Sequence, residues 1–376
     1  PAGVPMSWMS KWPGAYPVFV EEAKGSSFVD VDGNTYVDFC LGDTGSMTGH
    51  SPDAIATAIR EQVGRGMSTM LPSKDAAAVS EELAKRFNLP LWQFTVSATD
   101  ANRHAIRYAR LITGKAKVIV IDRCYHGSVD ESFATLDKKG NTVSREGNIG
   151  APVDLNLTTR VVAFNDLSAM EKALANDDVA AILMEPAMTN VGIVLPESGY
   201  LLAVQGLAKK FGALLIIDET HTISVGPGGM TADLGLTPDF LTIGKAIGGG
   251  FPTGAFGMQQ HIADSIKRLV ELEVIDTGGI GGTLAANALS LAAMRATLTK
   301  VLTKENFDRM IKLGDRWADG VEKVIAKFDL PWTVNRLGAR AEYMFSTITP
   351  KNGRQASDAG DFELEQYIHL RMLNEG

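Results

Sequence analysis

The sequence predicts an α/β protein with a mostly parallel central sheet, and two observations support this class. Short, mostly apolar runs recur along the middle of the chain and are separated by longer helical stretches. The runs occupy residues 118–121, 180–184, 214–217 and 240–243. Apolar strands that alternate with helices indicate a parallel sheet covered on both faces. Because 376 residues exceed one compact core of ordinary size, we expect two domains.

The first candidate site along the chain is the turn before a predicted helix over residues 100–111. Strand-like residues lead into Ser97, Ala98 and Thr99. Free amide groups at a helix start, together with nearby hydroxyls, can bind a dianionic phosphate. Ser and Thr at this position are also common as helix N-caps, so the turn alone does not identify a ligand.

Next along the chain, the predicted strand over residues 117–121 leads to Tyr125 and His126. They place an aromatic ring and an imidazole at a strand end. We expect His126 to be a structural or supporting histidine rather than a proton shuttle. Residues 138–159 are rich in Gly, Asn, Thr and Pro, which predicts a long loop over the active site.

Two charged side chains follow the later strands. Asp218 ends the run at 214–217, and Lys245 follows the run at 240–243 and precedes three consecutive glycines. Ligands of open α/β sheets bind where the strands end, so both side chains are expected to face one crevice. Taken singly, Asp218 is also explained as a turn cap and Lys245 as a lysine that extends its amine to solvent. A phosphate-binding P-loop is excluded because Asp239 and Ala246 replace its glycine and hydroxyl residue.

Together, Asp218 and Lys245 have a specific chemical meaning. A partly desolvated lysine loses its proton more readily, and the free amine attacks a carbonyl to form a Schiff base. A carboxylate opposite a pyridine nitrogen keeps that ring protonated and makes it an electron sink. This pair is expected of a pyridoxal 5′-phosphate site.

These residues carry a resemblance to the class III aminotransferases, which are fold type I pyridoxal-phosphate enzymes, and within them to the glutamate-1-semialdehyde aminomutase-like branch. The resemblance extends along nearly the whole chain. Its blocks occur in the family's order at residues 25–50, 97–110, 125–127, 185–186, 218–219, 245 and 282–287.

The resemblance implies a role for each matching residue. Lys245 would form the internal aldimine, and Asp218 would pair with the pyridine nitrogen. Tyr125 would stack on the ring, and Glu185 would lie behind the cofactor, although it is also explained as a strand-end glutamate before proline. The phosphate would be bound by Ser97, Ala98 and Thr99, and by Thr283 of the neighbouring subunit in a homodimer with shared active sites.

Three positions depart from the family's pattern. Ala98 replaces a glycine and resists a positive φ, which would reshape the phosphate site. Asp100 replaces a glutamate. His221 replaces the family's Gln or Met, which would place an imidazole near the cofactor's phenolic oxygen and alter its proton balance.

Composition excludes several other classes of function. The formal charge of −8 and the absence of basic runs argue against nucleic acid as a partner. The histidines show no metal-ligand spacing, and no apolar run is long enough for a membrane span. Two cysteines, with no leader at Pro1, suit a cytoplasmic protein.

The resemblance also implies a domain division. Residues 68–295 would form the large cofactor-binding domain, and residues 1–67 and 296–376 would form a smaller α+β domain. Gly376 ends the chain where family members continue, so either the protein is short or the chain is a fragment.

We expect the protein to be a transaminase that moves an amino group from an amine or amino acid donor to a keto acid, ketone or aldehyde acceptor. An aminomutase or racemase on the same scaffold is the alternative. A non-catalytic binding protein is the third possibility, and retention of both Lys245 and Asp218 argues against it.

Substrate identity is the least determined feature. Arg340 is a candidate for binding a substrate carboxylate, although pairing with an acidic neighbour such as Glu342 at the surface explains it at least as well. The resemblance places Asp43, Thr44 and Met47 in the substrate pocket.

Overall fold

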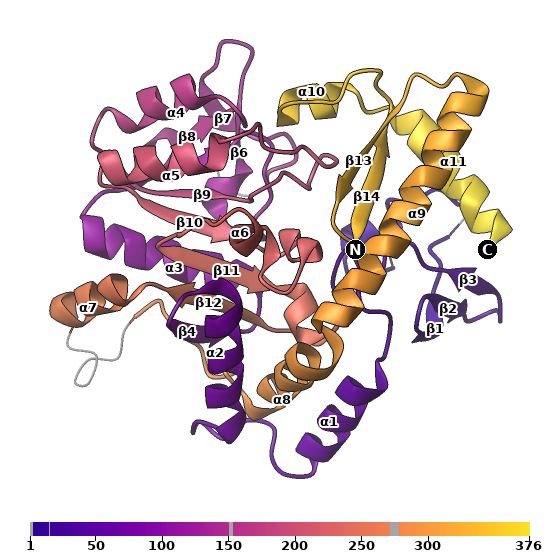
Figure 1. Cartoon of the computed structure of the whole chain (residues 1–376), viewed down its shortest axis with the longest axis horizontal. Helices are drawn as coiled ribbons and strands as arrows, with labels where there is room; N and C mark the ends of the chain where they lie inside the picture. The colour runs from indigo at the N-terminus through magenta and orange to yellow at the C-terminus, as the bar shows by residue number, and fades with distance from the viewer. Residues whose placement is uncertain (1–2, 15, 150–152, 271–277) are drawn as a thin grey trace.

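The computed structural model describes residues 3–14, 16–149, 153–270 and 278–376. A seven-stranded sheet forms the centre of the larger part of the molecule (Figure 1). Its order is β4 (Leu91–Thr95), β12 (Gly254–Met258), β11 (Phe240–Gly244), β10 (Leu214–Asp218), β9 (Val179–Met184), β5 (Lys117–Ile121) and β8 (Thr159–Val162). Strand β12 runs antiparallel to β11 and β4, and the other neighbouring pairs are parallel. The predicted fold class is confirmed.

The apolar runs correspond to β5, β9, β10 and β11, and each strand extends its predicted range by one residue. All residues of β9 and β11 are buried. Continuous burial explains why these strands appear as apolar runs rather than as an alternating pattern.

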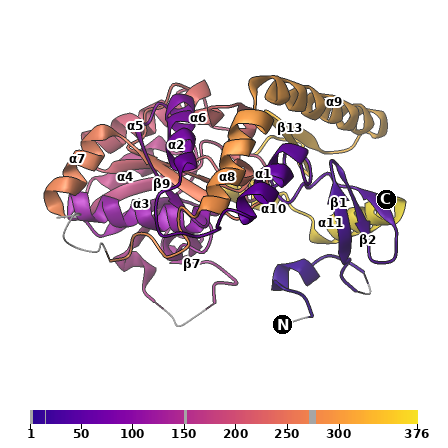
Figure 2. The same cartoon turned by 90° about the horizontal axis from the view of Figure 1, so that it is seen from below.

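Helices cover both faces of the sheet. The predicted helix over 100–111 is α3, which crosses one face, whereas α2, α5 and α6 lie on the other (Figure 2). The helices of this part are α2 (Lys74–Phe87), α3 (Ala98–Thr113), α4 (Leu167–Leu174), α5 (Tyr200–Lys210), α6 (Gly229–Asp233), α7 (Gln260–Leu269) and α8 (Ala288–Ala296). Helix α3 connects β4 to β5 in one direction across the sheet, whereas α4 and α5 connect β8 to β9 and β9 to β10 in the other direction. Because crossovers between parallel strands are right-handed, opposite directions place the helices on opposite faces.

The two ends of the chain lie together beside the large sheet (Figure 1). Their elements are β1 (Val20–Lys24), β2 (Ser27–Asp30), β3 (Thr35–Val37), α1 (Asp53–Val63), α9 (Lys304–Phe328), β13 (Thr333–Leu337), β14 (Arg340–Met344), α10 (Gly353–Asp358) and α11 (Phe362–Glu375). The Val37 amide donates to the Gly376 carbonyl at 2.9 Å, and the rings of Trp12 and His369 stack at 4.4 Å. These contacts are consistent with a small domain built from both ends, and the division at residues 67 and 295 stays a prediction.

The prediction of a long loop over the active site at 138–159 needs correction. This segment contains β7 (Thr142–Ser144), which pairs with β6 (Ala134–Leu136). The hydroxyl of Thr142 accepts from the amide of Val161 in the edge strand β8, so the hairpin packs at the edge of the sheet farthest from β4. Residues 150–152 lie outside the described part of the chain.

Across the described ranges, no helix is long and apolar enough to cross a bilayer.

Candidate active site

Lys245 lies where β11 ends and the short helix η5 (Lys245–Gly248) begins. Its backbone has a φ of 46°, an uncommon conformation for a residue with a side chain. The amine Nζ lies 2.7 Å from Asp43 Oδ2 and 2.9 Å from His221 Nε2. The side chain is 31% exposed, so its amine is accessible to a ligand from outside.

Asp218 ends the neighbouring strand β10, in register with Thr242 of β11. The predicted convergence of Asp218 and Lys245 on the same edge of the sheet therefore follows from the parallel pairing of their strands. The Asp218 carboxylate accepts hydrogen bonds from Asn102 Nδ2 and His126 Nδ1, both at 2.9 Å, and from the Thr220 amide at 3.0 Å. Burial opposes its ionisation, but these donors outweigh burial and lower the pKa of Asp218 to about 2.

His126 has the supporting place expected for it. Its ring is fully buried beside Asp218. Burial disfavours the charged imidazole, but the Cys124 thiol and the Asp218 carboxylate outweigh burial and raise the pKa of His126. The result is a buried, charge-compensated pair at the end of β10.

Asn102 was not singled out in the sequence, and the structure places it at the centre of this pair. Its amide donates to Asp218 and to the His126 carbonyl, and its oxygen accepts from the Thr242 hydroxyl at 2.6 Å. A signal was present, because Asn102 shares a helix face with Ala105 and Ala109. A fully buried amide on an apolar helix face needs polar partners.

The first turn of α3 has the geometry of an anion site. Ser97 is the N-cap, and its hydroxyl accepts from the Asp100 amide. Ala98 and Thr99 lie in the first turn, where amides have no acceptor within the helix. Ala98 belongs to the helix and has no positive φ, so the expected distortion of this site by alanine does not occur.

Glycines allow α3 to approach the sheet closely at this point. A Cβ on Gly254 would collide with the Ser97 carbonyl, and one on Gly244 would meet Ala98 at 2.9 Å. The glycines of β11 and β12 therefore set the depth at which the start of α3 lies against the strands.

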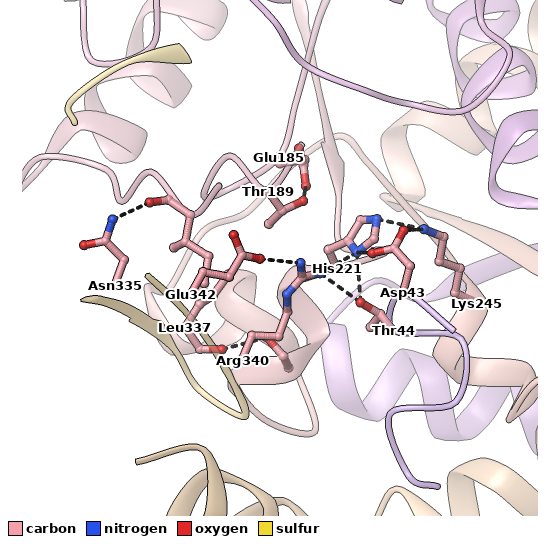
Figure 3. A network of polar contacts seen from close by, with 12 residues as sticks. Asp43, Thr44, Glu185, Thr189, His221, Lys245, Asn335, Leu337, Arg340 and Glu342 are labelled. Atoms are coloured by element: carbon pink, nitrogen blue, oxygen red, sulfur yellow. Dashed lines mark hydrogen bonds and ion pairs between the residues drawn. The ribbon is translucent and has the colours of Figure 1, made fainter. Parts of the chain in front are cut away.

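Glu185 and Tyr125 follow two further strands. Glu185 comes directly after β9 and accepts from the Thr189 hydroxyl at 2.5 Å (Figure 3). Burial raises the pKa of Glu185 to about 7. Tyr125 follows β5 and is 42% exposed, so the residue is accessible to a ligand.

The remaining polar side chains form a second group around His221 (Figure 3). His221 Nδ1 lies 2.7 Å from Arg340 Nη1 and 2.9 Å from Thr44 Oγ1. Arg340 also donates to Thr44 at 2.9 Å and to Glu342 at 2.9 Å. Arg340 thus has the expected acidic partner and still points into the site from β14.

Asp43 and Thr44 reach the site on an unusual turn. Leu41, Gly42, Asp43 and Thr44 have φ angles of 48°, 60°, 50° and 75°. Residues other than glycine rarely adopt this left-handed conformation, and consecutive ones are rarer still. In the sequence, Gly42 and Asp43 are the residues whose types favour such a turn.

Two predicted residues lie apart from these contacts. Met47 packs against a hydrophobic cluster between the sheet and α8 rather than forming a polar contact. Thr283 lies exposed in the segment before α8, and none of the polar contacts found for the described residues joins it to Lys245.

Comparison with known proteins identifies the family. The model of aminotransferase class III matches residues 8–360. Glutamate-1-semialdehyde 2,1-aminomutase 2 of Staphylococcus haemolyticus is 34% identical over 365 residues, which cover 96% of this chain and 83% of that protein. The crystal structure of a glutamate-1-semialdehyde aminomutase from Pseudomonas aeruginosa PAO1 is 47% identical with a TM-score of 0.96, covering 100% of this chain and 83% of that one. An omega-transaminase from Sphaerobacter thermophilus is 29% identical with a TM-score of 0.84, covering 94% and 82%.

The cofactor of this family fits the residues described. A lysine-to-alanine variant of the Pseudomonas enzyme was solved in complex with PMP, the amine form of pyridoxal phosphate. In this chain an accessible amine, a buried carboxylate held ionised and a helix start with free amides lie at one edge of the sheet. These are the groups that an aldehyde, a pyridine nitrogen and a phosphate require. The chain therefore belongs to the class III aminotransferase family, whose enzymes have fold type I and use pyridoxal 5′-phosphate.

Proposed function

We propose that this enzyme moves an amino group between two carbons of one small carboxylate-bearing substrate, as a glutamate-1-semialdehyde aminomutase does. The placement of the Lys245 amine and the buried Asp218–His126 pair at the ends of neighbouring parallel strands carries the amino-transfer chemistry. The relatives named above favour the aminomutase, which was the alternative to intermolecular transamination.

Lys245 and Asp218 are the catalytic residues of the proposal. Bound cofactor supplies an electron sink that stabilises negative charge on the carbon next to the amine. Asp218, held ionised by His126 and Asn102, would pair with the pyridine nitrogen and favour its protonated form. Lys245 would anchor the cofactor and would carry a proton between carbons as general base and acid. Positioned proton transfer of this kind contributes about 10² to 10⁴ in rate.

The surrounding residues would orient the cofactor. Ser97, Ala98 and Thr99 would bind the phosphate, and Tyr125 would cover one ring face. His221 lies within hydrogen-bonding distance of Lys245, which supports a place near the cofactor's phenolic oxygen. Glu185, buried with a pKa of about 7, is suited to the closed side of the ring.

The proposal includes a homodimer in which Thr283 completes the partner's phosphate site. Two observations support it. Thr283 is exposed, and its segment is anchored on α3, because Arg107 donates to the Gly279 carbonyl. Large apolar side chains are also exposed in the segment before α2, at Met67, Met70 and Leu71. Thr283→Ala should therefore weaken cofactor retention, and sedimentation of a fully active monomer would contradict the dimer.

Arg340 is the proposed carboxylate-binding residue, with Asp43, Thr44 and Met47 in the same pocket. Its side chain is 20% exposed, and a guanidinium can bind a carboxylate in a bidentate manner. Cys40 and Cys124 are both free, which supports the reducing cytosol as the location.

The stoichiometry of the reaction tests the proposal. Purified holoenzyme is incubated with glutamate 1-semialdehyde alone, and the isomer with its amine moved from C2 to C1 is quantified. Turnover of this single compound supports the aminomutase.

Intermolecular transamination is the second candidate, because the omega-transaminase shares the fold over 94% of this chain. Its test is a panel of amine donors supplied with pyruvate or 2-oxoglutarate. Activity that appears only with a second carbonyl compound would replace the aminomutase with a transaminase.

A further inference from the structure

The contacts of His221 determine which of its ring nitrogens carries a proton. Arg340 Nη1 lies 2.7 Å from Nδ1, and a guanidinium donates hydrogen bonds but never accepts them. Nδ1 must therefore be the acceptor. Thr44 Oγ1, 2.9 Å from Nδ1, then donates its hydroxyl proton to the ring rather than accepting from it. Asp43 Oδ1, at 3.8 Å from Nδ1, is too distant to accept a hydrogen bond from it.

His221 is also neutral. Burial lowers its pKa, and the Arg340 guanidinium acts in the same direction against the opposing carboxylates of Asp43 and Asp218. The titratable and charged groups that face the ring are Asp43 on the turn at 41–44, Asp218 of β10, Lys245 of η5 and Arg340 of β14. A neutral imidazole with an unprotonated Nδ1 carries its single proton on Nε2.

The Nε2 proton points at Lys245. Nε2 lies 2.9 Å from Nζ, which lies 2.7 Å from Asp43 Oδ2. An ammonium group has no lone pair and cannot accept from Nε2–H. An uncharged amine satisfies both contacts, because it accepts from His221 and donates to Asp43 (Figure 3).

We propose that Arg340 fixes the tautomer of His221 and that His221 thereby holds Lys245 as a free amine. His221 is a positioning residue, and the free amine is the form of lysine that attacks a carbonyl carbon. This inference rests on the proposed role of Lys245. It adds a link between the carboxylate-binding residue and the reactive lysine, which lie on separate elements, β14 and η5.

The link has a consequence for substrate binding. A carboxylate that engages Arg340 competes with Nδ1 for the same Nη1 donor. Once Nδ1 is released, the ring proton can move to it, and Nε2 becomes an acceptor for the lysine. Recognition of the substrate carboxylate would then change the proton state of Lys245.

Competitive labelling of the full chain without cofactor tests the proposal. Lysines are acylated over a range of pH, and mass spectrometry gives the labelling rate and midpoint pH of each one. Lys139 and Lys327 are exposed and serve as internal controls. The comparison is with His221→Met, which keeps the charge of the site and removes the imidazole donor.

The proposal expects Lys245 of His221→Met to be labelled about tenfold more slowly at neutral pH, with its midpoint at higher pH. If His221 instead accepts from a Lys245 ammonium, its removal would shift the midpoint to lower pH and overturn the proposal. Unchanged control lysines and an unchanged circular dichroism spectrum show that the variant is folded.

Arg340→Met tests the other half of the link. Removing this positive charge affects Lys245 directly, with or without His221, so the substitution is made both in the wild type and in His221→Met. The midpoint shift should be larger in the wild type, where the imidazole is present, than in His221→Met. Equal midpoint shifts in the two backgrounds would show that Arg340 does not act on Lys245 through His221.

Glutarate, which carries carboxylates but no amine or carbonyl group, tests the consequence for substrate. It should shift the Lys245 midpoint more in the wild type than in His221→Met. Equal shifts would contradict the competition at Arg340.

The proposed function is checked separately by borohydride reduction of the holoenzyme and mapping of the modified lysine. Cofactor attached to another lysine would refute the role of Lys245, whatever its labelling midpoint.

Discussion

The site consists of two polar clusters that differ in how they are built. The rear cluster contains Asp218, His126, Asn102 and Thr242, which are all buried and come from two central strands, α3 and the turn after β5. The front cluster contains Asp43, Thr44, His221, Lys245 and Arg340. Asp43 and Lys245 are partly exposed, and Asp43 and Thr44 lie on a left-handed turn.

This difference indicates two tasks. A buried charge is tolerated only when it is paired and hydrogen-bonded, and Asp218 meets this condition with three donors. The rear cluster is thus suited to hold one fixed electrostatic state. The contacts of the front cluster can be exchanged for contacts with a ligand, because its groups can regain hydrogen bonds from solvent or substrate.

The largest effect is expected from the front cluster, at its reactive amine. Lys245→Ala removes the proposed covalent anchor and proton carrier, so turnover should fall by about 10² to 10⁴-fold or more. Steady-state assays measure the loss, and absorbance shows whether cofactor binds noncovalently. Normal turnover in this variant would show that the front cluster has only a structural role.

In the rear cluster, Asp218→Asn keeps the shape and removes the charge. Single-turnover proton abstraction should slow far more than substrate binding weakens, because the charge acts on the transition state. Equal losses in rate and affinity would reduce Asp218 to a packing role.

The same variant should alter acid stability. The folded pKa of Asp218 is about 2 against an ordinary 3.8, so its ionisation stabilises the folded state above pH 3.8, and that contribution is lost as pH falls toward 2. Urea unfolding should show the wild type losing about 2 kcal/mol of its advantage over Asp218→Asn between pH 6 and pH 2. If the difference in unfolding free energy between the two proteins did not depend on pH, Asp218 would not be ionised in the folded rear cluster.

The sequence predicted the strand ends better than it predicted the turn at 41–44. Apolar strands are local patterns, and parallel pairing brings their polar ends together, so the placement of Asp218 and Lys245 at one edge of the sheet could be predicted. The left-handed turn at 41–44 could not, because its conformation depends on contacts with Lys245, His221 and Arg340, residues more than 170 positions away. Asn102 was overlooked because a single amide within an apolar helix face has no partner in the sequence.

A smaller effect is expected when the rear cluster loses a neutral member. Asn102→Ala leaves Asp218 and Thr242 each without one partner, and an unsatisfied buried group costs about 1 to 3 kcal/mol. Urea unfolding at neutral pH measures the loss. Alanine is a better helix former than asparagine, so helix propensity does not contribute to this loss. A loss below about 1 kcal/mol would show that water replaces the amide.

The smallest effect concerns the backbone that supports the front cluster. Leu41 has a φ of 48°, and a left-handed residue with a side chain costs about 1 to 2 kcal/mol relative to glycine. Leu41→Gly relieves this cost, whereas Leu41→Ala removes nearly the same side chain and keeps the Cβ. The glycine variant should therefore be more stable than the alanine variant by up to about 1 kcal/mol, after allowance for the greater freedom of unfolded glycine. If urea unfolding ranks alanine above glycine, the turn does not hold its left-handed conformation in solution, and Asp43 and Thr44 must reach Lys245 and His221 on a different backbone.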